Sequence, residues 1–505
     1  MFAEDISNKK FSPDTKLNIY DFFLSVFVPL WQFFPVYPGW DIKSNHMKRS
    51  CSVIVIVIAI VILLSGNKVI AAREDEPSTA PDNTEQSSPV LDVQKSPDDI
   101  AEGDEGYHPE GRRVGTPVDV DRDLDYSFPK RDYILQRIIP QKWFKWKEDL
   151  YEEYGVKLGI SYQTLYQNAS DTLTGNDEAW AGWALLEGKW EIFNRGKDFQ
   201  GSLVATLDSR HTLGNLEEPA TWGVQDVGSL WPTDMAYIEW DPWVPVAYWE
   251  QWFSKDRFVL RLGQQNAAQI YDFFRFKDPR VAFSNSMFTA PAGAQPFPAP
   301  GLSAAFELWP IKDSTLYVVG TVNDMNARPE MWQWDDAIRD ADFFYGLEVG
   351  YNWVRKPGDF DHLHLNLFYA DKPEDNPLPP FSSESGWGFK VLGEKQMGRF
   401  VAFGSYTYNT SEGDAFGVTF ARHATTAGFA FVKPFGLRGE IGLGTSWAQP
   451  KKDVLDSQFG AEAYWKFLLL PSLWVTPGVQ MIFDPTFNPA VDDVTIAQIK
   501  ARLFF

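Results

Sequence analysis

The chain has 505 residues, a charged fraction of 23% and a formal net charge of −22. This acidic balance argues against a nucleic acid partner, because nucleic-acid-binding proteins carry basic surfaces that neutralise phosphates. A single cysteine, Cys51, excludes a disulfide within the chain. Aromatic residues make up 16% of the chain and include 21 tryptophans, whereas the mean hydropathy is only −0.28.

Residues 47–72 are predicted to be a secretory signal peptide. A basic start at Met47 is followed by an apolar run from Val53 to Leu64 and by the small residues around Ala71. The alternative is a membrane anchor, but the run is shorter than the ~20 apolar residues that a spanning helix needs. A start at Met47 makes residues 1–46 a gene-model extension. Cleavage of the signal peptide would also remove Cys51, so the mature chain would contain no cysteine.

Residues 73–135 are predicted to be a disordered acidic periplasmic arm. Between Arg73 and Asp132 there are 17 acidic and 7 basic residues, a net charge of −10. The segment is also rich in Pro, Ser and Gly, so it has too little apolar area to offset the entropy that ordering would cost. A charge run of this kind is usually a solvated linker.

Residues 140–154 are predicted to form a short amphipathic helix. Trp143, Trp146, Leu150 and Tyr154 recur at helical spacing, and Pro140 stands near the start. The pattern leaves open whether this helix closes the mouth of a barrel or lies against a membrane surface.

From Gly155 to Phe505 the pattern changes to a period of two, which is typical of strands. Leu186 and Trp190 alternate with Glu187, Lys189 and Glu191, and many later runs repeat this arrangement. A β-sandwich would also alternate, but charges this regular, set opposite outward aromatics, favour a transmembrane antiparallel β-barrel with lipid outside and water inside. We therefore predict an all-β barrel over residues 155–505.

The last stretch, Val494–Phe505, is the closing strand in this interpretation. Thr495, Ala497 and Ile499 fall on one face, whereas Gln498 and Lys500 fall on the other. Such a strand would be prone to aggregation at the edge of a soluble sheet, and ring closure removes the edge. We expect it to pair with the first strand near Gly155–Gln167.

The strand number and the position of one long loop also follow from the sequence. About 17 candidate strands fall between Gly155 and Phe505, and bacterial barrels usually have even strand numbers. We therefore predict sixteen strands, with eighteen as the alternative. The longest break in the alternation runs from Gln264 to about Pro300, and its aromatic residues predict that it packs inside the barrel and narrows the pore.

Several stretches resemble the carbohydrate-selective porin family, the OprB-type outer-membrane porins. They are Tyr154–Tyr162, Leu260–Gln264, Pro296–Leu302 and Val475–Pro489, in this order and before a C-terminal Phe505. The resemblance covers about residues 141–505 and implies a channel for passive diffusion of sugars through the outer membrane of a Gram-negative bacterium. It also implies that Phe505 is the recognition signal for the outer-membrane assembly machinery. It supplies no sugar-contact residues position by position.

A sugar-selective pore needs hydrogen-bonding groups and weak apolar faces, without tight binding. Charges of both signs on the lumenal face supply many donors and acceptors while weakening ion selectivity. An ordinary water-filled barrel would also line itself with charges, so each of these residues is a candidate sugar contact only. The candidates are Glu187, Lys189, Glu191, Asp208, Arg210, Glu239, Arg257 and Arg261.

Other functions receive less support from the sequence. His362 and His364 share a face but lack an evident third metal ligand, and Glu187 with Glu191 lacks the cleft that a glycosidase needs. We expect no enzyme activity, metal or cofactor; the partners are outer-membrane lipid and small carbohydrate solutes. A general or ion-selective porin, an exporter of acidic polysaccharide and a barrel hydrolase remain alternatives, and the sequence does not distinguish a monomer from a homo-oligomer.

Overall fold

The computed structural model describes residues 120, 124, 141–254, 257–289, 293–310, 316–328, 334–352, 361–374, 381–437, 439–470 and 472–505. The predicted upstream extension (1–46) and the predicted signal peptide (47–72) lie outside the described residues. So does the predicted acidic arm (73–135), apart from residues 120 and 124.

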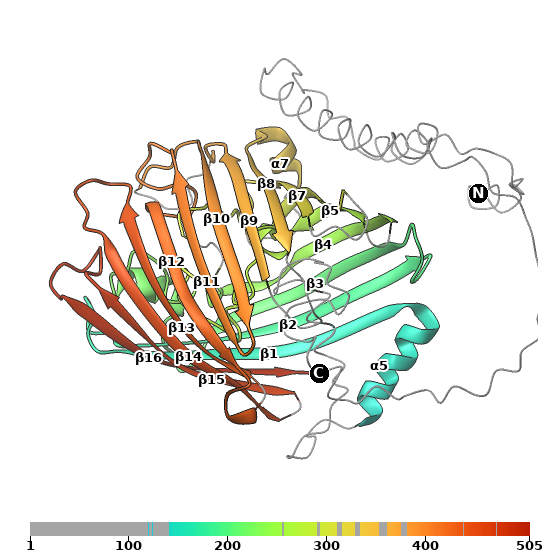
Figure 1. Ribbon diagram of the computed structural model, residues 1–505, viewed down its shortest axis with the longest axis horizontal. Helices are drawn as coiled ribbons and strands as arrows, with labels where there is room; N and C mark the ends of the chain where they lie inside the picture. Colours follow the sequence, from blue (N-terminus) through green and yellow to red (C-terminus); the bar gives the residue numbers. More distant parts are fainter. Residues whose placement is uncertain are drawn as a thin grey trace, which may run out of the picture. The chain divides into compact units, whose positions relative to one another are not determined.

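The described residues form a closed antiparallel barrel of sixteen strands (Figure 1), as the sequence predicted. Each strand pairs with its neighbours in the chain, and β1 pairs with β16 to complete the ring. The predicted amphipathic helix is also confirmed as α5, immediately before β1. The helices and strands are α5 (Gln141–Tyr154), β1 (Val156–Ala169), β2 (Glu178–Phe193), β3 (Gly201–Thr212), α6 (Pro219–Gln225), β4 (Trp240–Ser254), β5 (Phe258–Gln265), η1 (Ala267–Gln269), β6 (Gly301–Leu308), β7 (Leu316–Asp324), α7 (Trp334–Asp340), β8 (Phe343–Asn352), β9 (Asp361–Ala370), β10 (Gly386–Met397), β11 (Phe400–Asn409), β12 (Ala421–Val432), η2 (Pro434–Gly436), β13 (Gly439–Pro450), β14 (Gln458–Leu470), β15 (Leu473–Phe483) and β16 (Asp493–Phe504).

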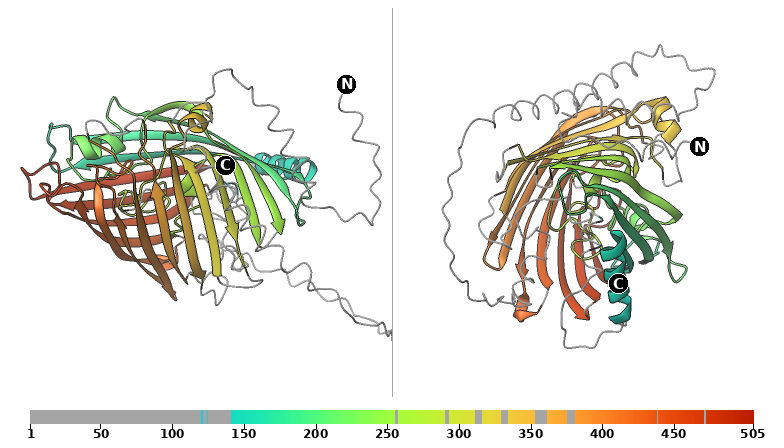
Figure 2. Two further views of the ribbon diagram at one scale, coloured as in Figure 1. Left: turned by 90° about the horizontal axis from the view of Figure 1, so that it is seen from above. Right: turned by 90° about the vertical axis from the view of Figure 1, so that its right-hand side faces the viewer.

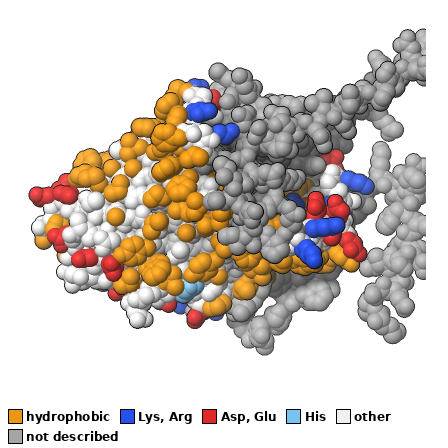
Figure 3. Space-filling view, turned by 90° about the horizontal axis from the view of Figure 1, so that it is seen from below, with side chains coloured by type: hydrophobic (Ala, Val, Ile, Leu, Met, Phe, Trp, Pro, Cys, Tyr) orange, Lys and Arg blue, Asp and Glu red, His pale blue; other side chains and the backbone are white. Residues whose placement is uncertain are grey.

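The period of two in the sequence separates an outer apolar face from an inner polar face. On β2 the outward Leu186 and Trp190 are 41% and 48% exposed, whereas the inward Glu187 and Lys189 are 3% and 5% exposed. Figure 3 shows the result on one outer face of the barrel, where hydrophobic side chains cover the middle and acidic ones gather toward an edge. Among the described residues, no helix combines the length and the apolarity of a membrane span.

The closing strand pairs as expected. Ser161 lies opposite Phe504 in the β1–β16 register, and the amide of Phe505 donates a hydrogen bond of 2.9 Å to the carbonyl oxygen of Ile160. Ring closure leaves the apolar C-terminal strand without an unpaired edge on which the strand of another chain could pair.

Short turns mark the end of the barrel where β1 begins and β16 finishes, which we call the short-turn end. A turn at 194–197 joins β2 to β3 here, with Asn194 and Gly196 at φ of 54° and 69°. Helix α5 lies at this end, because the ring of Trp143 is 6.5 Å from that of Phe505. Arg195 holds the end of the helix by donating to the carbonyl oxygen of Tyr151 at 2.7 Å.

The long connection between β5 and β6, described over residues 266–289 and 293–300, packs inside the barrel as the sequence predicted (Figure 2). Its aromatic side chains are buried against inward-facing wall residues: the ring centroid of Phe283 is 4.8 Å from that of Tyr464 on β14 and 5.7 Å from that of Phe403 on β11. Thus much of the hydrophobic core of this barrel lies in the lumen, between this loop and the wall.

Candidate functional site in the barrel lumen

A wall carboxyl group fixes the middle of the β5–β6 loop. Glu462 on β14 accepts hydrogen bonds from the backbone amides of Ser284 at 2.7 Å and Asn285 at 2.8 Å. The side-chain amide of Gln498 on β16 donates to the same carboxyl group at 2.8 Å. One inward glutamate therefore satisfies two backbone donors of a loop that has no ladder of its own.

Asp272 fixes the first part of the same loop to another arc of the wall, β8–β10. Its side chain accepts from Lys390 Nζ at 2.7 Å and from Asn366 Nδ2 at 2.9 Å, and its backbone amide donates to Glu348 at 2.6 Å. Burial would raise the pKa of Asp272, but Lys390 and Lys277 outweigh it and hold that pKa below its ordinary value. The carboxylate therefore stays charged and keeps the loop attached.

The two histidines that the sequence placed on one lumenal face belong to this attachment. The rings of His362 and His364 are stacked at 5.1 Å between centroids. His362 Nδ1 lies 3.0 Å from Glu394 and His364 Nε2 lies 3.4 Å from Asp272. Within the part of the chain that the structure describes, no group of three or more potential ligands could hold a metal ion.

On the opposite wall, Arg210 of β3 lies between two indole rings. Its guanidinium carbon is 3.9 Å from the ring centroid of Trp183 on β2 and 3.6 Å from that of Trp240 on β4. Arg210 also donates to Asp208, with Nη2 and Oδ2 separated by 2.7 Å. The strand register explains the stack, because Trp183 and Trp240 both lie opposite Arg210. We call Trp183, Asp208, Arg210 and Trp240 the Arg–Trp cluster.

The β5–β6 loop approaches this cluster from inside. The guanidinium carbon of Arg280 is 5.5 Å from the ring centroid of Trp183. Arg280 is held in turn by Asp278, to which its Nε donates at 2.7 Å, and Arg502 of β16 donates to the same carboxylate at 3.5 Å. Arg280 of the loop therefore lies between the Trp183 ring of the wall and the carboxylate of Asp278, which Arg502 of the wall also contacts.

Gln163 on β1 lies beside the Arg–Trp cluster. In the register it is opposite Trp183 on one side and Arg502 on the other. Its side chain is buried, and neither its amide nitrogen nor its amide oxygen has a hydrogen-bond partner among the described residues. A buried amide without a partner is costly, so this position favours a water molecule or a solute hydroxyl.

Three of the residues selected from the sequence lie together nearer the short-turn end. Lys189 Nζ and Arg261 Nε both contact the carboxylate of Glu250, at 2.8 and 3.0 Å. Glu187, the next inward residue on β2, is buried opposite Thr206. Glu250 was not among the candidates, although its inward position could have been found by extending the alternation along β4.

The other candidates are dispersed. Glu191 accepts from the hydroxyl of Tyr151 on α5 at 3.2 Å, at the short-turn end. Arg257 precedes β5 and donates to the carbonyl oxygen of Pro310 at 2.7 Å, so it fastens a turn. Glu239 is exposed and directly precedes Trp240, the first residue of β4.

The sequence reasoning missed Gln163, Trp183, Trp240 and Arg280. Gln163 and Trp183 fall on the same alternate positions as the charged inward residues of their own strands. The alternation in the sequence could therefore have identified both of them. The position of Arg280 was not predictable in this way, because the path of a loop through the lumen is not periodic.

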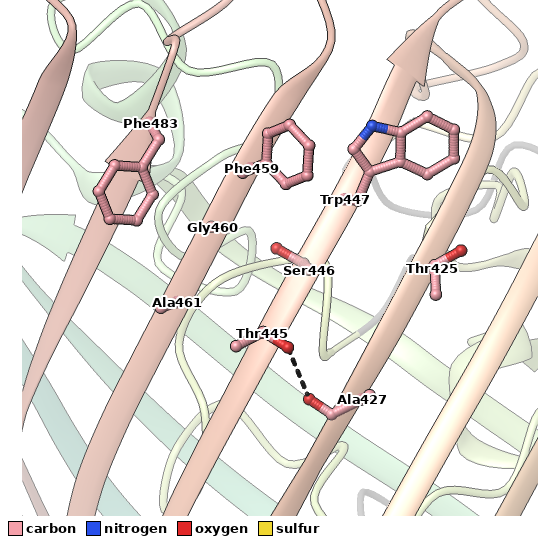
Figure 4. Close-up of a pocket in the computed structure, with 9 residues that line it drawn as sticks. All are labelled: Thr425, Ala427, Thr445, Ser446, Trp447, Phe459, Gly460, Ala461 and Phe483. Atoms are coloured by element: carbon pink, nitrogen blue, oxygen red, sulfur yellow. Dashed lines mark hydrogen bonds between the residues drawn. The ribbon is translucent and has the colours of Figure 1, made fainter.

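The described wall also carries a groove of about 530 Å³ on its outside (Figure 4). It is lined by outward residues of β12–β15, with Trp447, Phe459 and Phe483 around a floor of small residues that includes Ala427 and Ala461. Because these side chains point away from the lumen, the groove is separate from the Arg–Trp cluster.

Comparison with known proteins agrees with this fold. No family model matches the chain, and no curated protein matches it. Among solved structures, the high-pH structure of Pseudomonas putida OprB is similar with a TM-score of 0.55 and 13% identity, over 72% of this chain and 97% of that one. A triple mutant of the Rhodopseudomonas blastica porin matches with a TM-score of 0.42 and 12% identity, over 69% of this chain and 100% of that one. The first likeness shows that the chain has the sixteen-stranded barrel fold of a porin.

Proposed function

We propose that the protein is an outer-membrane porin through which carbohydrates diffuse passively into the periplasm of a Gram-negative bacterium. The apolar outer face suits contact with lipid, and the closed ring satisfies every strand edge, as a barrel in hydrocarbon requires. The predicted signal peptide is consistent with export. Outer-membrane barrels have their short turns on the periplasmic side, so we place the short-turn end of this barrel toward the periplasm.

The pairing of lumenal charges supports a neutral solute. Asp208 with Arg210, Glu250 with Lys189, and Asp272 with Lys390 are each within 2.8 Å of their partner. Opposite charges in contact cancel much of each other's field at a distance. A lumen lined in this way attracts small ions of either sign less than one lined by unpaired charges.

The observation that carries the proposal is the Arg–Trp cluster next to Gln163, whose side-chain amide has no hydrogen-bond partner among the described residues. Arg210 covers one face of each indole ring. The remaining surface of the two rings offers apolar contact to the ring of a sugar, and the amide and guanidinium groups offer hydrogen bonds to its hydroxyls. Together they provide several weak contacts instead of one strong one. Weak contacts suit a channel, because a solute that binds tightly does not leave.

Planar-bilayer conductance in the presence of sugars tests the proposal. We expect mono- or oligosaccharides to block the current reversibly, and Trp183→Ala to weaken this block by about 2- to 10-fold, as loss of about 0.5–1.5 kcal/mol of aromatic contact implies. The matched control is Trp190→Ala, which removes an outward indole from the same strand and should leave the block unchanged. Liposome swelling with a panel of sugars would identify which ones pass.

The alternatives give different results in the same apparatus. A general porin would conduct without block by any sugar, and an ion-selective porin would show a reversal potential in a salt gradient. An acidic-polysaccharide exporter would be blocked by polyanions only. A barrel hydrolase would cleave lipid or glycan in detergent and lose that activity with one lumenal substitution.

A further inference from the structure

An apolar patch lies inside the barrel, where a porin wall is ordinarily polar. Val204 on β3 and Val246 and Tyr248 on β4 all point inward and are 1%, 2% and 4% exposed. Val204 lies opposite Tyr248 in the register, so the patch is continuous across the two strands. Apolar groups in a water-filled lumen would lose free energy of burial, so the patch requires a cover.

The cover comes from the segment before the barrel. Val120 and Leu124 pack in one cluster with Val204, Val246 and Tyr248, and they are 1% and 0% exposed. Both residues are helical, and a spacing of four places them on one face of a helix. In the sequence they stand among four aspartates and one arginine over residues 119–125. Both described residues of this acidic stretch are therefore apolar and buried.

Cations border the patch. Lys189 is opposite Val204 in the β2–β3 register, and the guanidinium carbon of Arg261 is 5.5 Å from the ring centroid of Tyr248. Both cations contact the carboxylate of Glu250, and they are 5% and 1% exposed. A basic border around an apolar patch is complementary to a segment that alternates Asp with Val and Leu.

We propose that the segment carrying Val120 and Leu124 is a resident plug of this barrel, docked on the inner wall of β3 and β4 toward the short-turn end, and that it restricts passage through the pore. The effect on passage rests on the proposed porin function, but the docking does not. The docking concerns the residues around Val120 and Leu124 and leaves the rest of the predicted arm as it was expected from the sequence.

Disulfide trapping in the full-length chain tests the docking. In a Cys51→Ser background, Val120→Cys combined with Val204→Cys should form a disulfide on mild oxidation, detected by migration without reductant and by the mass of the linked peptides. The control pairs Val120→Cys with Leu203→Cys, because Leu203 is the adjacent outward residue and is 43% exposed. A second inward pair, Leu124→Cys with Tyr248→Cys, keeps the docking testable if the first double variant does not fold.

Crosslinking of the inward pairs, without the outward pair, is the expected result. Equal crosslinking of the inward and outward pairs, or failure of both inward pairs in barrels that migrate as folded, would overturn the proposal. These outcomes do not depend on conduction.

Conductance tests the restriction. Val120→Asn combined with Leu124→Asn should shift the docked-to-undocked ratio about 100-fold or more toward the undocked state, since two buried apolar side chains are lost, and should raise the mean conductance. The same change at Val90 and Leu91, two apolar residues elsewhere in the arm, is the control. Unchanged conductance in the first variant would refute the restriction. A barrel that conducts in no variant would contradict the porin function, and the crosslinks would still decide the docking.

Discussion

Replacement of Glu462 by alanine should release the middle of the β5–β6 loop without unfolding the barrel. The carboxyl group accepts from the amides of Ser284 and Asn285 at 2.7 and 2.8 Å, and both residues are buried. Each unsatisfied buried donor costs about 1–3 kcal/mol, and two donors lose their acceptor here. Water in the lumen would satisfy them in part, so the free energy that holds the loop to the wall should fall by about 2–3 kcal/mol. Local opening should then become about 30- to 150-fold more frequent.

Hydrogen exchange of the peptide containing Ser284 and Asn285 measures this opening in detergent-solubilised protein. Glu462→Gln keeps one acceptor oxygen and should give a smaller increase in exchange than the alanine variant. The control is Glu178→Ala, which removes a carboxyl group at the opposite end of the barrel from the short turns, where it accepts only from the hydroxyl of Tyr166 among the described contacts. Exchange that stays at the wild-type rate in a folded Glu462→Ala barrel would refute the reasoning and assign the attachment to aromatic packing instead.

Three further predictions concern assembly and stability. Deletion of Phe505 should lower the yield of folded, heat-modifiable barrel while leaving single-channel conductance unchanged; a normal yield would separate this residue from assembly. Gly439→Ala should lower the temperature at which the barrel unfolds on electrophoresis, because Gly439 has φ of 126° and a Cβ there would collide with the carbonyl oxygen of Lys466. Burial raises the pKa of Asp234, in the β3–β4 loop, to about 8, so the folded state binds its proton more tightly than the unfolded state does. Stability should therefore fall as the pH rises from about 4 to about 8, and Asp234→Asn should reduce this dependence; equal pH profiles for the two proteins would contradict it.

The sequence by itself determined the wall of this barrel. Alternation is a local property of strands, so Glu187 and Lys189 could be assigned to the inner face and Leu186 and Trp190 to the outer face from their parity alone. The same parity, together with the need to remove an exposed edge, predicted that the final strand would pair with the first. The number of alternating runs, about 17, gave sixteen strands only together with the rule that bacterial barrels usually have even strand numbers.

Only the tertiary structure decided what occupies the lumen. The contacts of Glu462 with Ser284, and of Arg280 with Trp183, join residues far apart in the chain along a loop that has no period. The burial of Val120 against Val204 was likewise not predictable, because the acidic composition around Val120 is an average over the segment. Such an average indicates whether a whole segment can offset the entropy of ordering, and it gives no position for one apolar side chain.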